Sequence, residues 1–138
     1  MSNSFAAIGT VFQKKNTTDV SYVHIAEVIS INWANVKLDL IDVTNMDSTG
    51  FYREFLPTLF DGGEISFELN YLPQDATQQA LKTDYDARTL LNMQLVLPSS
   101  LGTWSFTGYI QEMGKVLEID KQAKQSVKVK VTGKPTFA

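Results

Sequence analysis

The chain lacks several residue types on which common functional sites depend. It has no cysteine and only one histidine. Without cysteine, disulfides and thiolate metal sites are excluded. No apolar run approaches the roughly 20 residues that cross a bilayer, so no transmembrane helix is expected. The N-terminus has no positive segment followed by an apolar one, so no secretory signal is expected.

An excess of positive charge is also missing. The net charge is −3 at pH 7 and the pI is about 5.0. These values argue against a general nucleic-acid coat, because such binding depends on neutralising phosphates. The 138 residues, 43% of them hydrophobic and 20% charged, are typical of one soluble globular domain. We expect a single domain over residues 1–138, with a polar N-terminal arm at 1–9.

Residues 61–88 organise the rest of the chain. Gly62-Gly63 permits a tight turn into a strand in which apolar and polar residues alternate. The apolar face is Ile65, Phe67, Leu69 and Tyr71, and the polar face is Glu64, Ser66, Glu68 and Asn70. Pro73 ends this strand. Asp75, with Gln78 three residues later, then predicts a capped helix start.

The other periodic segments also predict strands. They are residues 10–13, 22–31, 36–43, 90–97, 104–113 and 126–132, the last ended by Gly133-Lys134-Pro135. Gly108 indicates a bulge or a close backbone approach. The helix is expected to turn Ala76, Ala80, Leu81 and Tyr85 inward and Gln78 outward. The fold class is therefore mainly β: an antiparallel β-sandwich or partly open barrel with one flanking α-helix.

Residues 44–61 are expected to form a long loop of unusual composition. The loop begins polar and then becomes strongly apolar, and Pro57 interrupts any helix within it. Its large apolar side chains are Met46, Phe51, Tyr52, Phe55, Leu56, Leu59 and Phe60. Each one left in water forfeits about 1.5–3 kcal/mol of burial. Two alternatives follow: the loop is a lid over its own core, or it is covered by another subunit.

Signals for catalysis are weak. His24 lies within an apolar strand pattern with no recognisable nucleophile or carboxylate partner, which favours a structural or surface role. The paired carboxylates, such as Glu64 and Glu68, have the spacing of any solvated face. We expect no enzymatic activity, no cofactor and no metal site. The competing hypothesis is a small-ligand or carbohydrate-binding β-barrel, with Trp33, Trp104 and Tyr109 lining its pocket.

The order of the motifs resembles the lambda-like major tail tube proteins of long-tailed bacteriophages. The stretches that carry the resemblance are GGEISFELNYLPQDATQQAL, a strand ending in Leu97-Pro98, WSFTGYIQEMGK and SVKVKVTGKP. They cover about residues 62–135, and their order and spacing are more specific than any one of them. The resemblance extends more distantly to the tube proteins of type VI secretion.

This resemblance implies a structural virion protein in the phage tail, assembled in the host cytoplasm. Hexameric rings with an inner β-barrel would stack into a tube that encloses a tape-measure protein and conducts DNA into the host. Residues 44–61 would reach the adjacent ring, and residues 1–9 would help stacking. Tail terminator and tail-tip proteins would be further partners. A lumen that passes DNA should be polar but not strongly basic, so Glu64, Ser66, Glu68 and Asn70 are the candidate lumen face.

Overall fold

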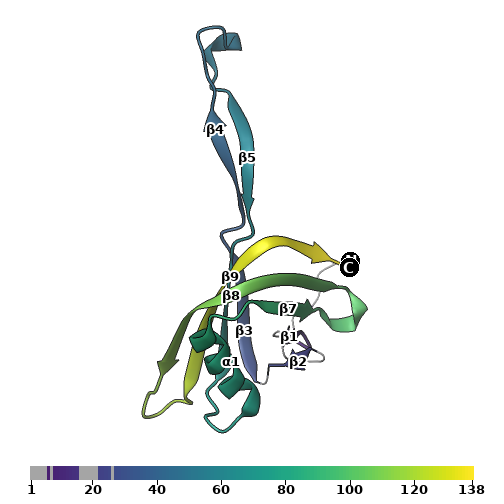
Figure 1. The fold of residues 1–138 in the computed structure, drawn as a ribbon, viewed down its shortest axis with the longest axis vertical. Coiled ribbons are helices and arrows are strands. Elements are labelled where there is room, and N and C mark those ends of the chain that lie inside the picture. The colour runs from purple at the N-terminus through teal and green to yellow at the C-terminus, as the bar shows by residue number, and fades with distance from the viewer. Residues whose placement is uncertain (1–5, 7, 16–21, 26) are drawn as a thin grey trace.

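The computed structural model describes residue 6 and residues 8–15, 22–25 and 27–138. In this part of the chain one curled antiparallel sheet carries a flanking helix and a separate two-stranded hairpin (Figure 1). The mainly β fold with one helix is therefore confirmed, in its partly open barrel form. Most of the predicted N-terminal arm at 1–9 lies outside the described residues.

The large sheet has seven strands, and every neighbouring pair is antiparallel. In spatial order they are β2 (Val23–His24), β1 (Val11–Lys15), β7 (Leu91–Val96), β8 (Thr103–Val116), β9 (Lys124–Phe137), β6 (Glu64–Asn70) and β3 (Val28–Ala34). The hairpin consists of β4 (Lys37–Asp42) and β5 (Phe55–Asp61). The helix is α1 (Ala76–Ala87), and two short 3-10 turns are η1 (Thr49–Phe51) and η2 (Pro98–Ser100).

The core lies on the concave side of the sheet, where alternation has placed the apolar side chains. In β6, Ile65, Phe67 and Leu69 are all at most 1% exposed, as the pattern predicts. Phe12 joins them from β1, with its ring centroid 4.8 Å from that of Phe67. Gly108 of β8 provides the predicted close approach, because a Cβ there would lie 2.6 Å from the Lys130 carbonyl oxygen. The core is thus complete without the hairpin.

Helix α1 begins as predicted, but the side chains that it buries are not all the predicted ones. The Asp75 carboxylate accepts a hydrogen bond from the Gln78 backbone N–H at 3.1 Å. Leu81 is fully buried, as expected. Gln78 was predicted to face outward and is buried instead, because its side chain bonds the Leu72 N–H and the Asn70 carbonyl. The helix is rotated accordingly, so Ala76 and Tyr85 are exposed, and the prediction that they face inward is wrong.

A buried ion pair joins this helix to the sheet. Lys14 of β1 donates to the Asp84 carboxylate at 3.1 Å, and the two side chains are only 1% and 6% exposed. Buried charges are tolerated only when they are paired. The pair therefore fixes where the C-terminal half of α1 sits on the sheet.

The structure differs from the prediction at the end of β9 and in the predicted loop over residues 44–61. Strand β9 does not end at Gly133-Lys134-Pro135 but continues to Phe137, because a bulge opposite Phe106 accommodates the extra residues. Residues 44–61 are not one long loop. Residues 55–61 form β5, which pairs with β4 from Lys37↔Asp61 to Asp42↔Phe55. Pro57 is tolerated because this two-stranded ladder leaves one edge of each strand free.

Candidate functional site

The β4–β5 hairpin projects away from the sheet as an arm, defined here as residues 37–61 (Figure 1). All seven apolar residues predicted in this region are exposed on it, from 51% at Phe55 to 98% at Met46. They are Met46, Phe51 and Tyr52 near the tip, and Phe55, Leu56, Leu59 and Phe60 on β5. The structure does not support a lid over the chain's own core.

Both faces of the arm are apolar. Leu40 pairs with Pro57, and the next pair, Ile41 with Leu56, projects to the opposite face. An isolated two-stranded hairpin is marginally stable in water. Covering only one face would leave the other exposed to water. Burial of the arm therefore requires other chains to contact both of its faces.

Polar contacts organise the tip of the arm. The Ser48 hydroxyl donates to Glu54 at 3.0 Å and accepts from the Asn45 N–H at 3.1 Å. The Thr44 hydroxyl accepts from the Glu54 N–H at 2.8 Å. With the turn fixed in this way, Phe51 is left 97% exposed. Its φ of 66° lies in the left-handed region, which is strained for an aromatic residue.

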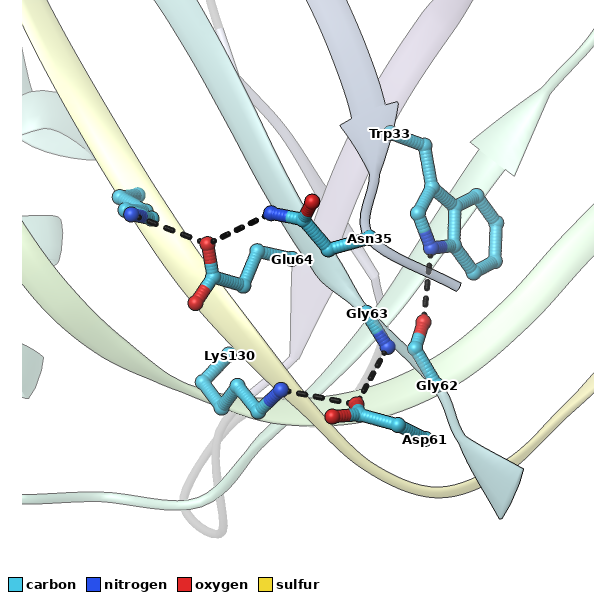
Figure 2. Close-up of polar contacts among 8 residues, drawn as sticks. Trp33, Asn35, Asp61, Gly62, Gly63, Glu64 and Lys130 are labelled. Atoms are coloured by element: carbon cyan, nitrogen blue, oxygen red, sulfur yellow. Dashed lines mark hydrogen bonds and ion pairs between the residues drawn. The ribbon is translucent and has the colours of Figure 1, made fainter. Parts of the chain in front are cut away.

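The base of the arm is fastened to the sheet by hydrogen bonds and ion pairs, most of which Figure 2 shows. The Trp33 indole N–H donates to the Gly62 carbonyl at 2.9 Å. The Asp61 carboxylate accepts from Lys130 and from the Gly63 N–H, both at 2.8 Å. Glu64 pairs with Lys128 at 2.9 Å. The direction of the arm is therefore set by side chains of the sheet.

Gly63 is required at this junction. Its φ is +83°, and an added Cβ would lie 2.4 Å from the Ala34 carbonyl oxygen. The tight turn predicted at Gly62-Gly63 is not formed, because the strands on either side of it, β5 and β6, pair with other strands and only Gly63 has a positive φ. The ion pairs were missed, because Asp61 and Lys130 are 69 residues apart and meet only through the β6–β9 pairing.

The ion pairs shift the ionisation of their members. The hydrogen bond from Lys130, with a second from the Gly63 N–H, holds the pKa of Asp61 below its usual value. The hydrogen bond from Lys128 lowers the pKa of Glu64, and the same contact raises the pKa of Lys128. All three groups therefore keep their charges at neutral pH.

Acid should loosen the base of the arm. A carboxylate with a lowered folded-state pKa stabilises the fold fully above its unfolded-state pKa of about 4, and that contribution is lost as pH falls through the folded value. In a Trp104→Phe background, Trp33 fluorescence should be constant from about pH 7 to pH 5 and change below about pH 4. Lys130→Met should move this midpoint to higher pH.

A matched control for this titration is Lys121→Met. Lys121 pairs with Glu118 at 3.2 Å in the β8–β9 turn, away from the arm base. The midpoint of that variant should equal the parent's. A midpoint that Lys130→Met leaves unmoved would contradict the role of the Asp61–Lys130 pair.

The predicted lumen residues lie together on the solvent side of the sheet. Glu64, Ser66, Glu68 and Asn70 alternate with the buried residues of β6. Their register partners on β9 bring cations to the same face: Lys130 stands opposite Glu64, and Lys128 opposite Ser66. Because Lys128 and Lys130 are paired with Glu64 and Asp61, this face is polar without being strongly basic.

The three aromatic residues predicted for a ligand pocket do not line one common pocket. Trp33 and Trp104 meet edge to face, with ring centroids 5.3 Å apart, on the core side of the sheet. Tyr109 is 45% exposed and pairs with Lys130 on the solvent side. His24 is exposed on β2. Among the described residues, no group of three or more His, Asp or Glu could hold a metal ion. No helix in this part of the chain is long and apolar enough to cross a membrane.

Comparison with known proteins gives a consistent result. The family model of the lambda phage tail tube protein matches residues 5–138. A chain of the native gene transfer agent virion is 15% identical, with a TM-score of 0.79 over 98% of this chain and 99% of that one. A chain from the tail of an empty gene transfer agent particle, which has C6 symmetry, is 18% identical, with a TM-score of 0.74 over 93% and 94% of the two chains.

A third similar structure is the SPP1 tail tube. It is 11% identical, with a TM-score of 0.66 over 93% of this chain and 74% of that one. No curated protein sequence matches the chain. At these identities the solved structures establish a shared fold.

Proposed function

The chain belongs to the lambda phage tail tube protein family, and from this premise we propose that it forms hexameric rings which stack into the tail tube of a virion. The family is a structural one, and we assign no catalytic role to the chain. Closing the sheet across neighbouring subunits would remove its free edges at β2 and β3. The symmetry of the similar gene transfer agent tail supports six subunits per ring.

The main observation that supports this proposal is the exposed arm. It presents apolar side chains on both faces and contributes nothing to the buried core of its own subunit. Exposed apolar patches of this kind mark interaction sites. In a stacked tube the arm would reach the adjacent ring, where neighbouring subunits can cover both of its faces. The N-terminal residues 1–9 would add to the same ring-to-ring contact.

The solvent side of β6 is the candidate lumen. Glu64, Ser66, Glu68 and Asn70 would line the channel, with Lys128 neutralised by its partner Glu64. A wall with few free cations would not retain phosphates, so DNA could pass through it. The tube would enclose a tape-measure protein before DNA passage, and tail terminator and tail-tip proteins would bind its two ends.

Cryo-electron microscopy of the purified protein would test the proposal. We expect concentration-dependent rings and stacked tubes, with Glu64, Ser66, Glu68 and Asn70 of β6 facing the channel. A protein that remains monomeric at high concentration and binds a small ligand tightly would contradict it. Tubes with these four residues on the outer surface would overturn the lumen assignment alone.

A further inference from the structure

A second apolar surface lies at the end of the molecule opposite the arm. The turn between β8 and β9 lies at that end, beside α1 (Figure 1). Leu117 is 71% exposed and Ile119 is fully exposed in this turn. Val116 and Leu72 beside it are also partly exposed. We call this end, formed by residues 71–79 and 115–125, the basal surface.

The basal surface contains a pocket of about 180 Å³. Its walls come from the start of α1, the end of β8 and the start of β9, and include Gln78, Lys115 and Gln125. Gln125 is only 2% exposed, and its side-chain oxygen has no hydrogen-bond partner among the described residues. This oxygen is buried in the wall, so the surface that the pocket offers to another chain is mainly that of the side chains around it.

We propose that the basal surface is the docking site for the arm tip of a second copy of the chain, located in the next ring of the tube. This inference rests on the proposed function. It adds which surface of the neighbouring subunit the arm would contact. The tip residues Met46 and Phe51 would pack against Leu117 and Ile119 beside the pocket.

The geometry requires the occupant to be another copy. Within one subunit the arm and the basal surface lie at opposite ends of the longest axis (Figure 1). The Trp33 hydrogen bond and the Asp61–Lys130 ion pair hold the arm in that direction. A contact between two different ends of identical subunits is heterologous and repeats without closing, as the stacking of rings requires.

Backbone strain at the tip supports the same pairing. The left-handed φ of Phe51 holds the nearly fully exposed ring at the tip, and such strain is typical of sites that bind a partner.

Disulfide trapping would test the inference directly, because the chain has no native cysteine. The double variant Met46→Cys/Ile119→Cys is assembled, oxidised and run on a non-reducing denaturing gel. We expect a ladder of covalent oligomers that extends beyond six chains, since each arm would join one ring to the next. Met46→Cys/Lys134→Cys, whose second position is exposed on β9, is the matched control and should remain monomeric.

The outcomes separate the inference from the proposed function. Tubes without a cross-link between positions 46 and 119 would overturn the docking site and leave the tube function intact. A ladder that stops at six chains would place the contact within a ring, which also overturns the inference. A ladder from the Lys134 control in place of Ile119 would move the docking site to β9. Absence of tubes from the unmodified chain would instead contradict the proposed function.

Discussion

Replacing Phe55 by aspartate should abolish tube formation and leave a folded subunit. Phe55 lies on β5 and is 51% exposed, so the new carboxylate would stay hydrated in the free chain. In the assembled tube that carboxylate would face apolar partner surface, and an unpaired buried charge is costly. The same penalty would recur in every subunit. Electron microscopy and sedimentation measure assembly, and far-ultraviolet circular dichroism and thermal melting measure folding.

The control for this variant is the same chemical change away from the arm. Leu90 is 39% exposed in the connection between α1 and β7. Leu90→Asp should form tubes at concentrations similar to those of the parent chain. Loss of folded structure in Phe55→Asp would show that the arm packs on its own core in solution, contrary to the projecting arm in Figure 1.

The strands of the seven-stranded sheet could be predicted because one face of each strand is buried. Ile65, Phe67 and Leu69 alternate with polar residues, and so do Val127 and Val129 of β9. In each case the period of two is a direct consequence of a core on one side of the sheet. The sequence also showed that the apolar side chains of residues 44–61 must be covered, but it left open whether the chain's own core or another subunit covers them.

The hairpin form of the arm could not be predicted in the same way. On β5 apolar residues occupy both faces, and Leu56, Leu59 and Phe60 show no alternation. Neither face of β5 lies on the core, so the alternation that usually marks a strand is missing. Gln78 was misplaced for a related reason. Its burial depends on backbone groups of Leu72 and Asn70, and only the folded chain brings these close.

Long-range ion pairs are the other feature that sequence reasoning missed. Lys14 and Asp84 are 70 residues apart and read locally as surface residues of a strand and a helix. Their burial follows from the position of α1 against the sheet, which no local pattern specifies. The arm-base pair of Asp61 and Lys130 is a second example.

Breaking the buried Lys14–Asp84 pair should destabilise the fold more than removing an exposed charge such as that of Lys82. Lys14→Met would remove the ion pair that Lys14 makes with the buried Asp84 carboxylate, at a cost of about 3–5 kcal/mol. For a chain of this size we expect the melting temperature to fall by roughly 10–17 °C. Urea unfolding of the purified chain would measure the loss of free energy. Lys82→Met, which removes the exposed i,i+4 partner of Asp86, should cost about 0.5 kcal/mol or less.

A double variant distinguishes loss of the charge pair from loss of packing. Lys14→Met/Asp84→Leu removes both charges, and apolar replacements of a buried pair are often neutral or stabilising. We therefore expect the double variant to recover most of the stability that Lys14→Met loses. If the double variant is as unstable as the single one, packing of the Lys14 methylenes, and not its charge, holds α1 on the sheet. Tube assembly should follow stability in Lys14→Met and in the double variant, because neither Lys14 nor Asp84 lies on the arm or the basal surface.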